Sequence, residues 1–234
     1  MTIMMVTGTG TEVGKTVTTA AVASAAMRAG RCVAVVKPAQ TGLRPGEPGD
    51  IHQVTLLAPG VHATECYRYP QPLAPTTAAR RSGLPAPDLD AVAVVVAALA
   101  TTHDLVLIEG AGGLLVSVDS VGRTLADLAL LLDDVQVLVV AAAGLGTLNA
   151  TALTAEALAT RNLACAGVVV GSWPSSPGLA ERSNLDDLPV AARAPLLGLL
   201  PAGIGELAPA EFTELAQRWL HPTLGGYWRR SELD

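Results

Sequence analysis

The sequence predicts an α/β fold, a doubly wound and mostly parallel sheet in a single domain. Short apolar runs recur along the chain and alternate with longer segments that are rich in alanine. Several runs lead directly into glycines, as strands do where a ligand-binding turn follows. The 234 residues suit one domain with a full core. Val, Leu and Ala should form that core, because half of the residues are hydrophobic but only 3% are aromatic.

The strands are expected where four or more apolar residues run together. This pattern is typical of parallel strands that are buried on both faces. The run CVAVV at 32–36 is one example, and LVLI at 105–108 is another. Strands are expected at about residues 2–7, 32–36, 65–69, 105–108, 135–142, 165–170 and 196–200.

Helices are expected between these strands. The first is rich in alanine and reaches Gly30, a residue type on which helices often end. Asp50 heads the second, where an aspartate commonly caps the N-terminus. The helices are expected at about residues 16–29, 50–57, 76–81, 89–100, 125–132, 149–161, 179–185 and 209–220. This reading places the catalytic domain at residues 1–222 and leaves a peripheral C-terminal tail at 223–234.

Charge and hydropathy argue against several partners. A net charge of −6 and a pI near 5.2 disfavour nucleic acid or an anionic membrane as the main partner. No apolar segment reaches the ~18 uninterrupted residues of a membrane span, and no basic targeting region precedes the first strand. A cytoplasmic protein is expected. Its three cysteines, Cys32, Cys66 and Cys165, are then expected to be buried, inert thiols.

The segment GTGTEVGKT at residues 8–16 predicts a phosphate-binding loop. It follows the first strand and opens the first helix, so its N–H groups and the helix dipole can point at one phosphate. Lys15 supplies a mobile ammonium for the outer phosphates, and Thr16 a hydroxyl for Mg²⁺. The loop is a lengthened variant, because Thr9 stands where the usual spacing has glycine. The alternative is a glycine-rich hairpin that happens to contain Gly-Lys-Thr.

Lysine usage indicates a second functional position. Of the fifteen basic residues, only Lys15 and Lys37 are lysines. An ammonium is a compact point charge, whereas a guanidinium is a wide planar fork, so both positions are expected to be sites where the fork does not fit. Lys37 follows the second strand, at the edge of the sheet where ligands bind. Glu109 ends the fourth strand, where nucleotide sites usually carry an aspartate that holds the metal.

Together these segments resemble the dethiobiotin synthetase family. The matching segments are TGTGTEVGKT at 7–16, KPAQTG at 37–42, EGAGG at 109–113, GLGTLN at 144–149 and GLLP at 198–201. The resemblance implies a P-loop NTPase-like fold and a ligase of biotin biosynthesis. Its reaction joins 7,8-diaminononanoate and CO₂ (or bicarbonate) as a carbamate, which ATP converts to a carbamic-phosphoric anhydride. The second amine then closes the ureido ring, giving dethiobiotin, ADP and phosphate.

The resemblance also implies catalytic, metal-binding and substrate-binding residues. The catalytic residues are expected to be Lys37, Lys15 and Glu12. Mg²⁺ is expected on Thr16, Asp50 and Glu109, although an N-cap role suits Asp50 equally well. The diamine is expected to contact Thr11, Lys37, Thr41, Gly112 and, at its carboxylate tail, Asn149 of a second subunit. A homodimer with the substrate site at the subunit interface follows from that pattern.

The nucleotide is expected to lie along the loop and across the ends of several strands. The residues implied are Glu12, Val13, Gly14, Lys15, Thr16, Val17, Asp50, Glu109, Gly110, Ala111, Gly112, Gly171, Ser172, Pro201, Ala202 and Gly203.

Two positions depart from the family pattern. Gly10 stands where the family often has Asp, and this change should be tolerable because the position contributes mainly backbone. Gly171 stands where the family usually has an Asn that contacts adenine, so the base would meet backbone groups only. A lost contact of this kind is worth ~1–3 kcal/mol. CTP or another triphosphate could therefore serve as well as ATP, and Gly171→Asn should shift the preference toward ATP.

Two other classes of protein fit less well. Partitioning and septum-positioning ATPases share the general fold but carry a second lysine in the loop, at the position of Gly10. They also tend to have a surface for DNA or membrane, and no basic patch is visible here. The amidation domains of cobyrinate-type synthases require a glutaminase domain, for which this chain has no room.

Overall fold

The structure, a computed structural model, describes residues 1–230. It contains a seven-stranded sheet with the strand order β3-β2-β4-β1-β5-β6-β7. Every pairing between neighbouring strands is parallel, which confirms the predicted fold class. The strands are β1 Thr2–Gly8, β2 Val33–Thr41, β3 His62–Tyr69, β4 Leu105–Gly113, β5 Val135–Ala141, β6 Ala164–Trp173 and β7 Leu196–Pro201.

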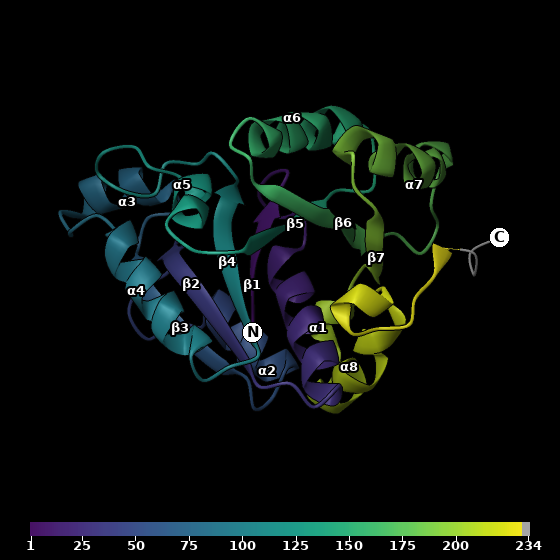
Figure 1. The fold of residues 1–234 in the computed structure, drawn as a ribbon, viewed down its shortest axis with the longest axis horizontal. Coiled ribbons are helices and arrows are strands. Elements are labelled where there is room, and N and C mark those ends of the chain that lie inside the picture. Colours follow the sequence, from purple (N-terminus) through teal and green to yellow (C-terminus); the bar gives the residue numbers. More distant parts are fainter. Residues whose placement is uncertain (231–234) are drawn as a thin grey trace.

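Helices connect the strands and cover both faces of the sheet, as Figure 1 shows. They are α1 Lys15–Arg28, α2 Asp50–Leu57, α3 Pro75–Ser82, α4 Leu89–Ala100, α5 Leu125–Leu130, α6 Thr147–Ala159, α7 Leu179–Ala192 and α8 Pro209–Leu215. Three short 3₁₀ turns follow the last strand: η1 Ile204–Glu206, η2 Ala216–Arg218 and η3 Pro222–Leu224.

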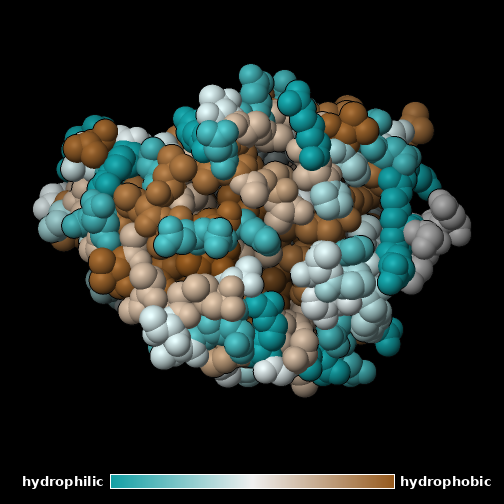
Figure 2. Space-filling view, viewed as in Figure 1, coloured by the Kyte–Doolittle hydropathy of each residue, from teal (hydrophilic) through white to brown (hydrophobic). Residues whose placement is uncertain are grey.

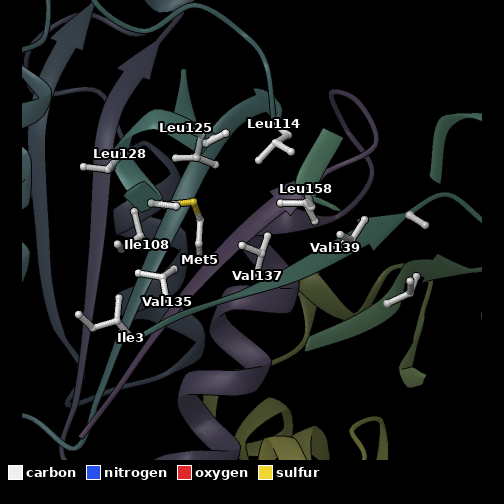
Figure 3. Packing of buried hydrophobic residues seen from close by; sticks show 14 of the residues in the cluster. Ile3, Met5, Ile108, Leu114, Leu125, Leu128, Val135, Val137, Val139 and Leu158 are labelled. Carbon is white, nitrogen blue, oxygen red and sulfur yellow. The ribbon is translucent and has the colours of Figure 1, made fainter. Parts of the chain in front are cut away.

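The sheet divides the core into two layers. The central strand β1 contributes to both, because successive side chains of a strand point to opposite faces. Ile3 and Met5 belong to the cluster under α4, α5 and α7. Met4, between them, belongs to the cluster under α1, α2 and α8. Figure 3 shows the first cluster, with Met5 among side chains from β4, α5 and β5. The apolar runs are therefore buried on both faces, as their composition predicts.

Three strands, β2, β4 and β6, run further than their apolar runs predict, and β6 continues to Trp173 through residues that the sequence suggests are a turn. β2 continues through Lys37 to Thr41, because its pairing with β3 continues to the register pair Thr41 and Tyr69. β4 likewise continues beyond Ile108 to Gly113. The polar and glycine-rich ends of these strands resemble turns in sequence, but they still pair along the sheet.

Two helices also differ from their predicted bounds. α7 runs to Ala192 with Pro189 inside it, whereas the sequence predicts an end near residue 185. Leu188 and Ala192 are both buried, so the packing of this helix outweighs the hydrogen bond that proline cannot donate. The last predicted helix, 209–220, divides into α8 and the 3₁₀ turn η2.

The cysteines and the C-terminal segment differ from expectation in burial. Cys32 is exposed, and Cys66 and Cys165 are only half-buried, so the prediction of three buried thiols is wrong. Burial nevertheless raises the pKa of the Cys66 and Cys165 thiols. The described part of the predicted tail packs on the domain, with Leu224 and Trp228 buried; residues 231–234 of that tail lie outside the described residues.

The surface exposes apolar side chains in places. Figure 2 shows apolar surface on the side of the molecule where α4 and α5 lie, and Val94 and Leu130 are exposed there. Apolar surface of this kind can mark a contact with another protein, and the homodimer stays a prediction. Within residues 1–230, no helix has both the length and the apolar character needed to cross a bilayer.

Candidate nucleotide and substrate site

A crevice opens at the carboxyl ends of three neighbouring strands, β2, β4 and β1. This is the edge of a parallel sheet at which ligands bind. Its volume is ≈ 450 Å³. The residues that line it are Thr11, Glu12, Gly14, Lys15, Thr16, Val17, Lys37, Ala39, Gln40, Thr41, Asp50, Glu109, Gly110, Ala111 and Gly112. Most residues predicted from sequence are therefore brought together in one place.

The glycine-rich loop between β1 and α1 has the geometry of an anion site. Gly14 and Glu12 have positive φ angles of 94° and 60°, which turn the loop sharply before the helix. Within residues 1–230, no backbone N–H from Gly10 to Thr16 donates a hydrogen bond to another part of the chain. These N–H groups and the N-terminus of α1 together favour a phosphate.

The Lys15 ammonium folds back over this loop. Its Nζ donates a hydrogen bond to the carbonyl oxygen of Gly10, 2.8 Å away. Burial lowers the pKa of Lys15, and the positive charge of Lys37 lowers it further. A phosphate would oppose both effects, since a negative charge nearby favours the charged ammonium. The loop also leaves room at Gly10, where an added Cβ would meet only Val13 Cγ1 at 4.0 Å.

The second lysine is the centre of a buried polar cluster. Lys37 Nζ lies 2.8 Å from Glu109 Oε1 and 2.5 Å from Asp50 Oδ2, and it donates to the carbonyl oxygen of Gly110 at 3.1 Å. Lys37 and Glu109 are only 2% and 1% exposed. Burial alone would lower the pKa of Lys37, but the charges of Glu109 and Asp50 outweigh it and raise the pKa.

The three predicted metal ligands converge on this cluster. Thr16 Oγ1 donates a hydrogen bond to Glu109 Oε1 at 2.9 Å. Asp50 is the first residue of α2 and Gly49 is its N-cap, so the alternative that Asp50 caps the helix is wrong. Glu109 Oε2 is buried and has no hydrogen-bond partner among the described residues.

This donor set fits Mg²⁺ better than a transition metal. In residues 1–230, no group of three or more His, Cys, Asp and Glu side chains could hold a metal ion. Mg²⁺ is usually held by one or two carboxylates, with phosphate oxygens and waters completing the shell. Asp50 and Glu109 supply two carboxylates and Thr16 adds a hydroxyl, and Oε2 of Glu109 has no hydrogen-bond partner within residues 1–230.

An apolar hollow adjoins the crevice, with a volume of ≈ 370 Å³. The two spaces share four lining residues: Thr11, Thr41, Ala111 and Gly112. Beyond these, the hollow is lined by residues 72–75 and by Val116. Residues 70–75, which include three prolines, are held in place by Gly42, whose N–H donates to the Gln71 carbonyl at 3.0 Å. Part of this segment, residues 72–75, therefore forms one wall of the hollow.

Several predicted residues lie outside the crevice. Asn149 is exposed in the first turn of α6. Gly171 lies instead behind the phosphate loop, where an added Cβ would be 2.2 Å from the Val13 carbonyl oxygen. The exposed Ser172 and the turn at residues 201–203 follow at the ends of β6 and β7. The N–H of Ala202 donates to the Trp173 carbonyl at 2.7 Å, so the end of β6 and the turn at residues 201–203 are neighbours.

Sequence reasoning missed two residues that line the crevice, Ala39 and Gln40. Both stand in the KPAQTG segment that was compared with the family. Their position in that segment, between Lys37 and Thr41, could have indicated that they line the site. Gln40 is 5% exposed, although its side chain is polar.

Comparison with known proteins decides the family. A family model described as an AAA domain matches residues 2–205. The ATP-dependent dethiobiotin synthetase of Streptomyces avermitilis is 60% identical, over 97% of this chain and 95% of its own length. The corresponding enzyme of Rhodococcus jostii is 57% identical, over 100% and 99%. The chain belongs to the dethiobiotin synthetase family. This membership makes it an ATP-dependent enzyme with a ligase role in biotin synthesis.

Solved structures with the same fold come from other families. The septum site-determining protein MinD of Pyrococcus horikoshii, solved with Mg-ADP, has a TM-score of 0.60 at 16% identity, over 93% of this chain and 95% of its own. A ParA-family ATPase of Chlorobium tepidum has a TM-score of 0.58 at 12% identity, over 96% of each chain. At these identities the likeness shows the fold alone, and it confirms the P-loop NTPase-like architecture.

Proposed function

We propose that this member of the dethiobiotin synthetase family closes the ureido ring of dethiobiotin from 7,8-diaminononanoate, CO₂ and a nucleoside triphosphate. The observation that carries the proposal is the arrangement around Lys37. A buried ammonium lines a crevice that also holds the phosphate loop and that adjoins an apolar hollow. Such an arrangement suits a substrate that has polar amines at one end and an aliphatic chain behind them.

The phosphate loop accounts for the nucleotide. The free N–H groups of the loop and the Lys15 ammonium would bind the β- and γ-phosphates, and Glu12 at the loop tip would face the reacting groups. Thr16, Asp50 and Glu109 would hold Mg²⁺. When bound, the ion neutralises phosphate charge, which is the main requirement of phosphoryl transfer.

The hollow accounts for the diamine. Its chain would lie against the wall at residues 72–75 and Val116, with Thr11, Thr41 and Gly112 near its polar end. The carboxylate tail would extend to Asn149 of a second subunit, so the complete site needs a homodimer. The exposure of Asn149 leaves it accessible to a partner.

The chemistry then follows from charge. One amine takes up CO₂ and loses a proton to form a carbamate, whose negative charge Lys37 can stabilise. The γ-phosphoryl group passes to the carbamate oxygen, giving the anhydride and the nucleoside diphosphate. The second amine attacks the carbamate carbon and loses a proton to solvent, the C–O bond to phosphate breaks, and a urea and inorganic phosphate are formed. Lys37 can stabilise the anions at each stage because it remains charged.

The direct test is product analysis. The full chain is incubated with the diamine, bicarbonate, Mg²⁺ and ATP, and in parallel with CTP. Mass spectrometry should detect the cyclic urea, with one diphosphate and one phosphate released for each urea. If no urea forms with any triphosphate, the proposed function is wrong.

A further inference from the structure

Gln40 occupies an unusual position for a long polar side chain. It lies near the end of β2 and is 5% exposed. Both ends of its amide are used within the protein. Oε1 accepts a hydrogen bond from the backbone N–H of Asp50 at 2.9 Å, and Nε2 donates to the Thr41 carbonyl at 3.1 Å.

The contact with Asp50 replaces a missing cap. The first N–H groups of a helix have no partner within the helix and are usually satisfied by the side chain of the N-cap residue. The N-cap of α2 is Gly49, which has no side chain. Gln40, on strand β2, supplies the acceptor instead. It therefore holds Asp50, the first residue of α2, in place.

Gly49 is the residue that allows this approach. A Cβ at Gly49 would lie 2.8 Å from Gln40 Oε1 and 3.0 Å from Arg68 Nη2. Its φ of −118° is accessible to any residue, so the requirement for glycine here is one of space and not of backbone conformation.

Arg68 braces the loop that leads into Gly49. It is the register partner of Gln40 on β3. Its Nη1 group donates to the carbonyls of Arg44 and Glu47, at 3.0 and 2.8 Å. Its other donors are held by Glu65, at 2.6 and 2.7 Å. The start of α2 is therefore held from two adjacent strands.

We infer that Gln40 is a positioning residue, which sets the Asp50 carboxylate against Lys37 and so prepares it to hold the divalent ion. The inference rests on the proposed metal-binding role of Asp50. The Asp50 side chain is 35% exposed, and Lys37 is its ion-pair partner among the described residues. Without the Gln40 acceptor, the first turn of α2 loses the contact that keeps this carboxylate in place. Loss of such an outer contact typically weakens a metal site 10- to 100-fold.

The test compares two variants, each of which removes a side-chain hydrogen-bond acceptor at the N-terminus of a helix. Gln40→Met keeps the length of the side chain but removes the acceptor for Asp50. Asp88→Ala removes the acceptor at the N-terminus of α4, where Asp88 Oδ1 holds the N–H groups of Asp90 and Ala91 at 2.9 and 3.2 Å. Both variants should lower the melting temperature. Only Gln40→Met should raise the Mg²⁺ concentration for half-maximal turnover, by about tenfold, with kcat at saturating Mg²⁺ within about threefold of wild type.

A binding measurement separates this inference from the proposed function. Calorimetry of ADP at several Mg²⁺ concentrations should show metal-dependent binding in the wild type, and a metal requirement shifted upward in Gln40→Met. If the wild type itself shows no metal dependence, the proposed metal site is wrong. If the wild type does and Gln40→Met matches Asp88→Ala, Gln40 is only a helix cap and the inference is overturned.

Gly49→Ala provides a second route if Gln40→Met does not fold. The added methyl group displaces the Gln40 amide without deleting it. It should raise the Mg²⁺ requirement by about threefold or more. A Gly49→Ala protein with an unchanged metal requirement would equally overturn the inference.

Discussion

Lys37 and Glu109 form a buried ion pair, with 2.8 Å between Nζ and Oε1 and side-chain exposures of 3% and 1%. Removing one partner from such a pair leaves a charge in a poorly solvated place and typically costs about 3–5 kcal/mol. Asp50 reduces that cost here, because it contacts the same ammonium at 2.5 Å. The cluster therefore tolerates a change at one carboxylate and is a practical target for substitution.

Glu109→Gln is expected to separate metal binding from nucleotide binding. The amide has the shape of the carboxylate but carries no charge, so the variant should require about tenfold more Mg²⁺ for nucleotide binding. Lys15 and the loop N–H groups remain, and binding at saturating Mg²⁺ should be partly retained. Calorimetric titrations of nucleotide at several Mg²⁺ concentrations measure both quantities. An unchanged metal dependence would remove Glu109 from the metal shell.

Lys37→Arg is expected to retain the charge and lose turnover. Lys37 is 2% exposed and its surroundings hold a compact ammonium, whereas a guanidinium is larger and planar. We expect kcat below about a tenth of wild type, a loss of more than ~1.4 kcal/mol of transition-state stabilisation. Nucleotide affinity should change by less than about threefold, because the phosphate loop is untouched. Turnover above that tenth would place the lysine away from the chemistry.

Tyr69 gives the protein a defined alkaline sensitivity. Its hydroxyl donates to the Pro85 carbonyl at 2.7 Å, and burial, with a contribution from Tyr67, raises its pKa from 10.0 to about 12. The unfolded state therefore ionises first. The stabilisation provided by the neutral hydroxyl is complete below pH 10 and is lost as the pH rises toward 12.

Tyr69→Phe should show this dependence as a changing difference from wild type. Near neutral pH the variant should be less stable by about 1 kcal/mol, the contribution of one hydrogen bond. Above pH 10 the difference should shrink and then reverse, because phenylalanine does not ionise. Urea unfolding across this range measures it, with Tyr227→Phe, at a half-exposed tyrosine, as the control. A difference that stays constant with pH would show that the Tyr69 hydroxyl titrates normally.

The parts of the site that the sequence could predict are those set by the sheet. Lys37 and Glu109 lie on the neighbouring strands β2 and β4, and the ends of parallel strands meet at one edge. The hydrophobic pattern was therefore enough to bring them together. The contact between Lys37 and Asp50 depends instead on the path of the loop at 43–49. That path is fixed by Arg68 and Gln40 through contacts to backbone atoms, which leave no pattern in the sequence.

Gly171 shows a further limit of the same kind. The role of Gly171 depends on which part of the chain packs against it, and that contact cannot be predicted from the sequence. The close contact with Val13 shows that a side chain at this position would displace the phosphate loop. Gly171→Asn is therefore no longer a clean way to shift nucleotide preference, because it should weaken binding of every triphosphate.

Nucleotide preference is best measured in the wild type. With Gly171 in contact with the loop, the end of β6 at residues 171–173 and the neighbouring turn at 201–203 would offer the base mainly backbone groups. Backbone C=O and N–H groups can serve adenine or cytosine, because both bases present an amino group beside a ring acceptor. We therefore expect kcat/KM for CTP to be at least comparable to that for ATP, since each missing side-chain contact to adenine forgoes about 1–3 kcal/mol of discrimination. The measurement is kcat/KM for the two triphosphates at saturating diamine, bicarbonate and Mg²⁺. Strict selectivity for ATP would mean that a side chain elsewhere reads the adenine edge, and the backbone account of this pocket would be wrong.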